Sequence, residues 1–263
     1  MEDTMLMSYV LDAGKNRHNM DVLSEIHLDH KTIAFKDIVG TGKKQINFSE
    51  VKIDIAKDYA AEDADITFRL YKIFSKNIKL EKLLNIYEIF EKPLIKILAL
   101  MEIYGVKVDQ KFLQVLSSKF EKKINNLEKE IYKVTKKEFN IGSTKQLGEV
   151  MYNEMKISSL KKTKKGSFAT SAQVLEGLAF KGHKLPKLVL DWRQVTKLKN
   201  TYSDSLQEHI NPITRRVHTS FLLAATSTGR LASSDPNLQN IPIKSEDGKE
   251  IRRAFVAEKN SKL

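Results

Sequence analysis

Three side chains near the C-terminal end of the sequence have chemistry suited to contacting duplex nucleic acid of any base sequence. Arg230, Asn237 and Gln239 lie in a polar segment between two apolar stretches, 217–225 and 251–257. A guanidinium can donate into a minor groove, and the amides can meet base-edge or sugar acceptors without demanding one sequence. Because a polar connection this long inside a compact domain is usually functional, we interpret the segment as a duplex-contacting surface.

The elements that must position this segment are predicted from apolar periodicity. The stretches 217–225 and 251–257 each predict a strand. Upstream, residues 94–103 predict a helix that Gly105 ends, and a heptad-like seam predicts a second helix of about 25 residues. We expect these two helices to pack as an antiparallel pair. The seam consists of Leu113, Leu116, Phe120, Ile124, Leu127, Ile131 and Val134.

Lysine is concentrated on the predicted hairpin and in the loop that follows it. Residues 111–165 contain 14 Lys and 6 Glu, a net charge of 14 − 6 = +8. The predicted helices also have expected starts. Asp109 and Ser143 occupy positions typical of helix N-caps.

The charge of this region suits one class of ligand. An elongated basic hairpin suits a phosphate backbone because each neutralised phosphate releases condensed counterions. A solvated lysine surface is the alternative that charge alone leaves open. The lysines of the loop are Lys161, Lys162, Lys164 and Lys165.

The composition of the whole chain restricts its partners. Its net charge of +12 favours nucleic acid or an acidic membrane surface. Residues 1–65 hold 8 Lys+Arg and 13 Asp+Glu, a net of −5, so the other residues carry 12 + 5 = +17. No apolar run approaches the roughly 18 residues that span a bilayer, and no secretory pattern is present. The lack of cysteine excludes disulfides and thiolate metal sites. We expect a cytoplasmic protein.

Several segments resemble family A DNA polymerases, the bacterial DNA polymerase I type. TSTGRLASSDPNLQNIPI resembles the family's segment that runs along the primer–template just before the palm, and RRAFVA resembles the following strand. The resemblance extends over nearly the whole chain, in the family's order. It includes YAAEDADIT, GVKVD, NIGSTKQLGEV and DWRQVTKLKNTY.

The resemblance implies a fold class and a domain plan. The expected fold is α+β and mostly helical. Residues 1–76 would be the C-terminal remnant of an RNase H-like 3′–5′ exonuclease domain, and 77–263 the N-terminal part of the polymerase domain. The helical thumb hairpin would occupy about 90–200 and the first antiparallel palm strands about 201–263.

The resemblance also assigns DNA-contacting roles. Arg230 is similar to the arginine that donates to the minor-groove face at the primer terminus, and Asn237 and Gln239 to residues touching the duplex near the insertion site. Arg193 and Lys197, one turn apart on a predicted helix, resemble phosphate contacts at the base of the thumb. The thumb tip would carry Lys145, Lys161, Lys162, Lys164 and Lys165.

Tyr59 and Asp63 match the family's third exonuclease motif, which puts a phenol and a carboxylate on one helix face. In the family the aspartate binds a divalent metal, Mg²⁺ or Mn²⁺, and the tyrosine orients the attacking water. The remaining exonuclease carboxylates belong to earlier motifs, and the polymerase aspartates to strands after RRAFVA. We therefore expect this chain to lack most of both catalytic sites and to bind no metal tightly by itself.

Three functions are compatible with these observations. The favoured one is part of a DNA-directed DNA polymerase acting in replication and repair, with primer–template as partner and deoxynucleoside triphosphates as partners of the complete enzyme only. The second is a stand-alone, non-catalytic duplex-binding module. The third is a basic membrane-surface or scaffold protein, which the duplex-contacting segment disfavours. We expect a monomer without a membrane partner, associated with the bacterial nucleoid.

Overall fold

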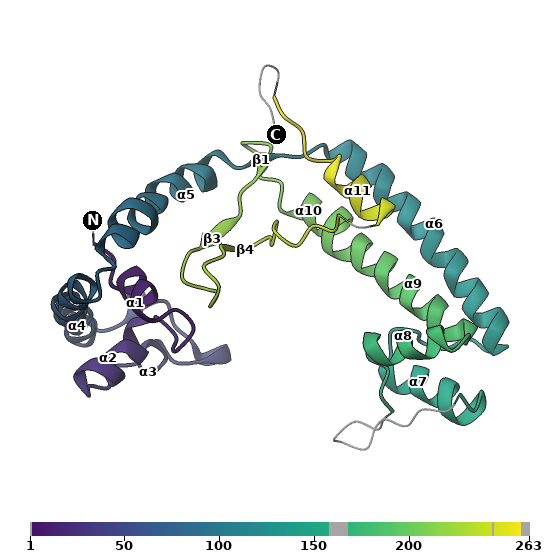
Figure 1. Ribbon diagram of the computed structural model, residues 1–263, viewed down its shortest axis with the longest axis horizontal. Coiled ribbons are helices and arrows are strands. Elements are labelled where there is room, and N and C mark those ends of the chain that lie inside the picture. The colour runs from purple at the N-terminus through teal and green to yellow at the C-terminus, as the bar shows by residue number, and fades with distance from the viewer. Residues whose placement is uncertain (1, 158–167, 244, 259–263) are drawn as a thin grey trace. The chain divides into compact units, whose positions relative to one another are not determined.

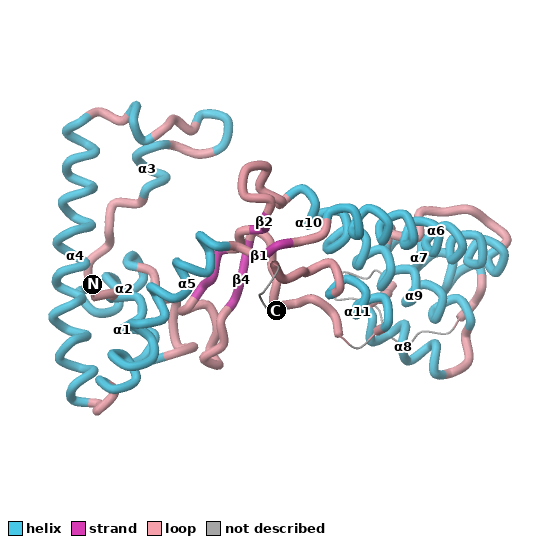
Figure 2. The backbone as a smooth tube through the Cα atoms, turned by 90° about the horizontal axis from the view of Figure 1, so that it is seen from above, coloured by secondary structure: helices cyan, strands magenta, loops and turns pink. Residues whose placement is uncertain are grey.

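The chain is mostly helical, with a few short antiparallel strands (Figure 2). The computed structural model describes residues 2–157, 168–243 and 245–258. Within them, no helix is both long enough and apolar enough to cross a bilayer.

Packing divides the chain into two compact units. Unit 1 consists of Met1–Tyr104 and Thr219–Gln239, and unit 2 of Gly105–His218 and Asn240–Leu263. This division separates groups of packed residues. The exonuclease, thumb and palm boundaries expected from the sequence stay predictions.

The first part of unit 1 is assembled around one long helix, α4 (Ile53–Leu80). α1 (Thr4–Asp12) and α2 (Met20–Leu28) pack against it, and α3 (Phe35–Val39) precedes it in the chain (Figure 1). The buried side chains of α4 recur every four residues, which makes one apolar face of the helix. The core consists of Leu6, Met7, Leu23, Ile66, Leu70, Phe74, Ile78 and Tyr87.

The second part of unit 1 carries a hairpin. A π-helical turn, Ile86–Glu91, leads into α5 (Lys92–Tyr104). The antiparallel strands β3 (Ser220–Leu222) and β4 (Ala232–Ser234) pair with Phe221 opposite Ser233. β3 contacts α5, so the loop between the strands starts from a supported base.

Unit 2 is built on the amphipathic helix α6 (Gln110–Thr135). As predicted, its apolar seam faces the core, with Leu127 and Val134 partly buried and the other seam residues buried. Asp109 is its N-cap, whose carboxylate accepts a 3.0 Å hydrogen bond from the Phe112 N–H. The seam packs against α9 (Lys184–Leu198), and α9 also packs against α8 (Ala172–Phe180). The core continues into α7 (Thr144–Gly148), which Ser143 caps. α7 runs into a π-helical turn, Glu149–Glu154.

The remaining elements of unit 2 follow α9 in the chain. A third π-helical turn, Lys199–Asp204, continues into α10 (Ser205–Glu208). The short strand β1 (Val106–Lys107) pairs antiparallel with β2 (Arg216–Val217). α11 (Glu246–Arg252) contacts both α6 and α9.

Three predicted elements are wrong. Residues 251–257 are not a strand, because α11 reaches Arg252 and only Phe255 forms an isolated bridge, to Val108. The stretch 217–225 is divided between β2 and β3, whose partners differ. α6 packs against α9, whereas α5 belongs to unit 1.

Candidate nucleic-acid interface

Arg230 lies in the loop of the β3–β4 hairpin in unit 1. Thr226 closes this loop: its hydroxyl donates to the Arg230 carbonyl oxygen at 2.7 Å and accepts from the Arg230 N–H at 3.1 Å. Gly229, with φ +76°, supplies the left-handed backbone that the tight closure requires. The Tyr9 hydroxyl donates to the Thr226 carbonyl oxygen at 2.8 Å. The backbone of Arg230 is therefore fixed, while its exposed guanidinium has no hydrogen bond or ion pair within the described residues.

Asn237 and Gln239 follow β4 and are exposed. The Asn237 Oδ1 accepts the Gln239 N–H at 3.1 Å. Because a backbone N–H can only donate, the Asn237 atom facing it must be the oxygen, and the amide nitrogen is left to donate elsewhere. Thr219 fixes the start of this turn, since its hydroxyl contacts the carbonyl oxygens of Ser234 and Pro236.

Thr226 and Thr219 were not singled out from the sequence. The available signal was a threonine within a turn segment, because hydroxyl side chains in turns often form hydrogen bonds with the nearby backbone. Their contact partners, however, could not be assigned from spacing alone.

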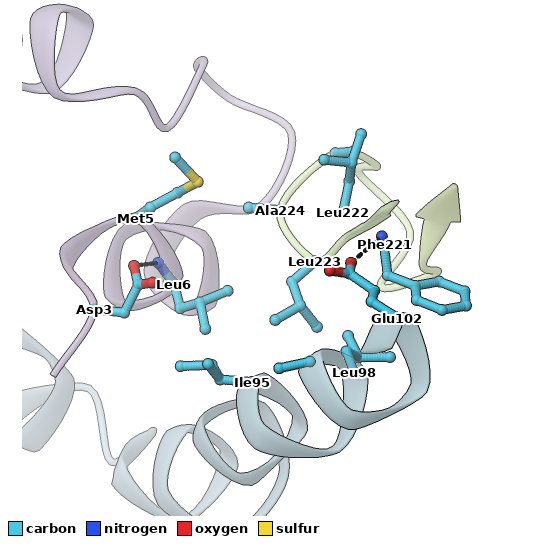
Figure 3. A pocket seen from close by; sticks show the side chains of 12 residues that line it. Asp3, Met5, Leu6, Ile95, Leu98, Glu102, Phe221, Leu222, Leu223 and Ala224 are labelled. Carbon is cyan, nitrogen blue, oxygen red and sulfur yellow. Dashed lines mark hydrogen bonds between the residues drawn. The ribbon is translucent and has the colours of Figure 1, made fainter. Parts of the chain in front are cut away.

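A cavity of about 430 Å³ lies at the base of the hairpin in unit 1. Its walls come from α1, α5 and β3, and the Glu102 carboxylate accepts a hydrogen bond from the Phe221 N–H (Figure 3). None of the predicted site residues lines it. The cavity thus belongs to the support of the hairpin rather than to its contact surface.

Arg193 has a structural bond in unit 2 that the sequence did not predict. Its Nη1 donates to the Thr170 carbonyl oxygen at 2.6 Å, and burial lowers the pKa of its guanidinium. Arg193 therefore holds residue 170, which precedes α8, against α9. The remaining donors of its guanidinium fork can still contact a phosphate.

Lys197 and Lys145 are exposed on α9 and α7, and neither forms an ion pair within the described residues. Lys197 lies one turn beyond Arg193, as predicted. The four loop lysines, Lys161, Lys162, Lys164 and Lys165, lie outside the described residues.

Tyr59 and Asp63 lie on α4 in unit 1. The Tyr59 ring contacts Phe35 and Phe48, with centroids 6.1 and 6.0 Å away. Burial raises the pKa of Tyr59, and the neighbouring Asp63 carboxylate raises it further. The pKa of Asp63 is itself raised by burial, although the Tyr59 hydroxyl acts in the opposite direction.

The carboxylate of Asp63 could serve as a ligand for a divalent metal, but one carboxylate by itself does not make a metal site. Its Oδ1 is buried without a hydrogen-bond partner within the described residues, whereas the adjacent Glu62 bonds His30 and the Ile33 N–H, both at 2.7 Å. A buried oxygen without a partner is costly unless a ligand satisfies it. No group of three or more metal-binding side chains occurs within the described ranges.

The candidate residues therefore form two sets. Unit 1 carries Tyr59, Asp63, Arg230, Asn237 and Gln239, and unit 2 carries Lys145, Arg193 and Lys197. In unit 1, the hairpin presents fixed hydrogen-bond donors. In unit 2, helices present cations.

Comparison with known protein families shows which family the chain belongs to. The model of DNA polymerase family A matches residues 110–263, more than half of the sequence. The chain belongs to this family. A 3′–5′ exonuclease model matches residues 1–79 of the same family A chain.

Individual family A relatives match along nearly the whole sequence. DNA polymerase I of Rhizobium leguminosarum is 50% identical over 262 residues, covering 100% of this chain and 26% of the relative. DNA polymerase I of Pseudomonas aeruginosa is 45% identical, covering 99% of this chain and 29% of the relative. The chain thus spans between a quarter and a third of the length of these relatives.

A solved structure is also similar to the chain. It is the POL domain of Pol1 from M. smegmatis in complex with DNA primer-template and dNTP. The likeness has a TM-score of 0.79 and 31% sequence identity, over 97% of this chain and 41% of that one. The mostly helical fold with few antiparallel strands is therefore a family A fold, as predicted.

Proposed function

We propose that this chain binds the duplex part of a primer–template during template-directed DNA synthesis by a DNA polymerase I type enzyme. Family membership and a solved relative in complex with primer-template support the ligand class. The observation that carries the proposal is the donor character of the β3–β4 hairpin. Arg230 offers only donors, and Asn237 is left with its amide nitrogen because its oxygen is already used.

Donors are what a sequence-independent reader of a minor groove needs. Every Watson–Crick pair presents acceptors there, the purine N3 and the pyrimidine O2. Arg230 can meet such acceptors at any base pair. A distorted pair displaces these acceptors, so a rigid arginine backbone also makes the contact sensitive to pair shape.

Phosphate contacts are assigned to unit 2. Lys145 and Lys197 are exposed and unpaired within the described residues, so each can neutralise a phosphate without first breaking an ion pair. Arg193 contributes the part of its guanidinium that Thr170 does not use. We include the lysines at 161–165 from the resemblance alone.

The catalytic parts of the proposal concern the complete enzyme. Asp63 would supply one carboxylate to an exonuclease site with Mg²⁺ or Mn²⁺, a cation that would stabilise charge on the reacting phosphate. Tyr59 would position a water molecule beside it. Nucleotidyl transfer and binding of deoxynucleoside triphosphates are assigned to residues other than these 263, on the resemblance alone.

The proposal is tested by primer–template binding of Arg230→Ala, measured by fluorescence anisotropy at fixed salt. We expect binding about ten- to a hundredfold weaker, since a charged hydrogen-bond donor contributes about 1.5–3 kcal/mol. Arg230→Lys should retain part of the affinity, because one donor group remains. Arg17→Ala, which removes an exposed arginine elsewhere in unit 1, is the matched control.

Equal affinity of the Arg230 and Arg17 variants would remove Arg230 from the duplex contact. In a longer polymerase carrying these residues, Arg230→Ala should slow primer extension, and more so past a mismatched pair. Unchanged mismatch extension would contradict the pair-shape role.

A further inference from the structure

Four lysines of α6 form a stripe that the proposed function does not use. Lys111, Lys122, Lys129 and Lys133 are separated by 11, 7 and 4 residues, close to whole numbers of 3.6-residue turns. They therefore share one helix face, and it lies opposite the seam packed against α9. All four are exposed, and none forms an ion pair within the described residues. We call this face the lysine stripe.

Most of the exposed positions beside the lysine stripe carry uncharged polar groups, and Val115 is an apolar exception. Gln114, Ser118, Asn125 and Asn126 are all exposed on this side of α6. Two of the neighbouring carboxylates are directed elsewhere, since Glu121 pairs with Lys199 at 3.0 Å and Glu128 accepts the Trp192 Nε1–H at 3.0 Å. Glu130, beside Lys129, is exposed and offsets part of the positive charge at this end of the stripe. Lysines with amides and a hydroxyl between them are the side chains that contact phosphates and sugars.

Other lysines of α6 behave differently. Lys119 pairs with Glu250 at 2.6 Å and Lys123 with Asp247 at 2.5 Å, and both carboxylates belong to α11. These lysines hold α11 on α6. The unpaired state of the lysine stripe is thus specific to one face and is not a general property of lysines on this helix.

We propose that the lysine stripe is a second binding surface for double-stranded DNA, contacted through the phosphate backbone. From Lys111 to Lys133 it extends about 33 Å at 1.5 Å per residue, comparable to one turn of duplex. No exposed aromatic side chain accompanies it, so the stacking platform of a single-strand site is missing from this face.

This surface is distinct from the one in the proposed function. Arg193 and Lys197 lie on α9, whereas the lysine stripe is on the side of α6 that faces away from α9. The inference goes beyond the proposed function in adding a second segment of duplex on the opposite side of the helix pair.

The test replaces all four lysines of the stripe by glutamine, which retains helix propensity, and measures duplex binding from 50 to 200 mM salt. We expect binding at least tenfold weaker at the lower salt. The slope of log affinity against log salt should fall by about 3 to 4, since each phosphate contact contributes about 0.9. Circular dichroism checks that helicity is retained. The matched control replaces four exposed lysines of unit 1, Lys31, Lys36, Lys76 and Lys79.

A salt slope equal to that of the control would overturn the lysine stripe as a DNA surface. Equal loss of binding to a single-stranded oligonucleotide of the same length would overturn the duplex assignment. A second background, Arg230→Ala with Arg193→Gln and Lys197→Gln, separates this inference from the proposed function. It should still bind duplex through the stripe, and complete loss of duplex binding there would reject a second surface.

Discussion

Asp63 in unit 1 and Asp204 in unit 2 are both partly buried carboxylates, yet their pKa values move in opposite directions. Burial raises the pKa of each. For Asp63 the hydrogen bond from the Tyr59 hydroxyl opposes burial but does not outweigh it, and the pKa stays raised. For Asp204, hydrogen bonds from Lys199 and Ser117 outweigh burial, and its pKa is lowered.

The difference separates Asp204, a carboxylate that stabilises the fold, from Asp63, a carboxylate available to a binding site. Asp204 accepts from the Ser117 hydroxyl at 2.6 Å and from Lys199 at 2.8 Å, which joins α6 to the π-helical turn after α9. Asp63 keeps one buried oxygen without a partner within the described residues. A satisfied group stabilises the fold, whereas an unsatisfied one costs stability that a ligand can recover.

The largest expected effect follows from removing Asp204. Asp204→Ala should lower the free energy of unfolding of unit 2 by about 2 kcal/mol, because Ser117 loses its acceptor and Lys199 keeps only its pair with Glu121. Trp192, the only tryptophan of the chain, lies in unit 2, so its fluorescence in urea reports this unit. Removing Glu246, whose pair with Lys249 is exposed, should change stability by less than about 0.5 kcal/mol. If both variants unfolded at the same urea concentration, the Asp204 network would be only a surface ion pair.

Asp63→Asn should change the free energy of unfolding in the opposite direction to Asp204→Ala, and by a smaller amount. It removes a charge that burial disfavours and keeps the shape of the side chain, so unit 1 should be unchanged or stabilised by up to about 1 kcal/mol. Urea unfolding followed by circular dichroism measures this. Glu62→Gln provides the contrast, since Glu62 holds His30 and the Ile33 N–H and its loss should destabilise by about 1 kcal/mol. Clear destabilisation by Asp63→Asn would mean that the ionised carboxylate stabilises unit 1 through the Tyr59 hydroxyl by more than burial costs.

The sequence predicted elements whose signals are local. The α6 seam, the Asp109 and Ser143 caps and the end of α5 before Gly105 depend on residues within a few turns of each other. α11 was missed although Ser245, followed by Glu246 and Asp247, is a typical helix start. The apolar residues at 254–257 favour a strand over the same stretch, so two local signals compete there.

Partners distant in sequence could not be predicted. Arg193 bonds a carbonyl oxygen 23 residues away, which no periodicity encodes. The contact between Lys199 and Asp204 is local, but i and i+5 diverge on an α-helix. The π-helical turn at Lys199–Asp204 brings them together, since its repeat is i to i+5. The candidate roles in DNA contact came from resemblance and stay predictions.

The smallest expected effect is on the loss of stability at acid pH, that is, on how the free energy of unfolding falls as the pH drops below about 4. Asp204 has a folded-state pKa below its ordinary value of 3.8, so between these values the unfolded chain binds more protons than the folded one. The stability that Asp204 contributes is therefore present above about pH 4 and is lost as the pH falls through its folded-state pKa. In Asp204→Asn, the free energy of unfolding measured by Trp192 fluorescence should fall less steeply with decreasing pH than in the parent chain. An unchanged dependence on pH would show that the Lys199 and Ser117 bonds do not favour the ionised form, and the contrast with Asp63 would then reduce to burial alone.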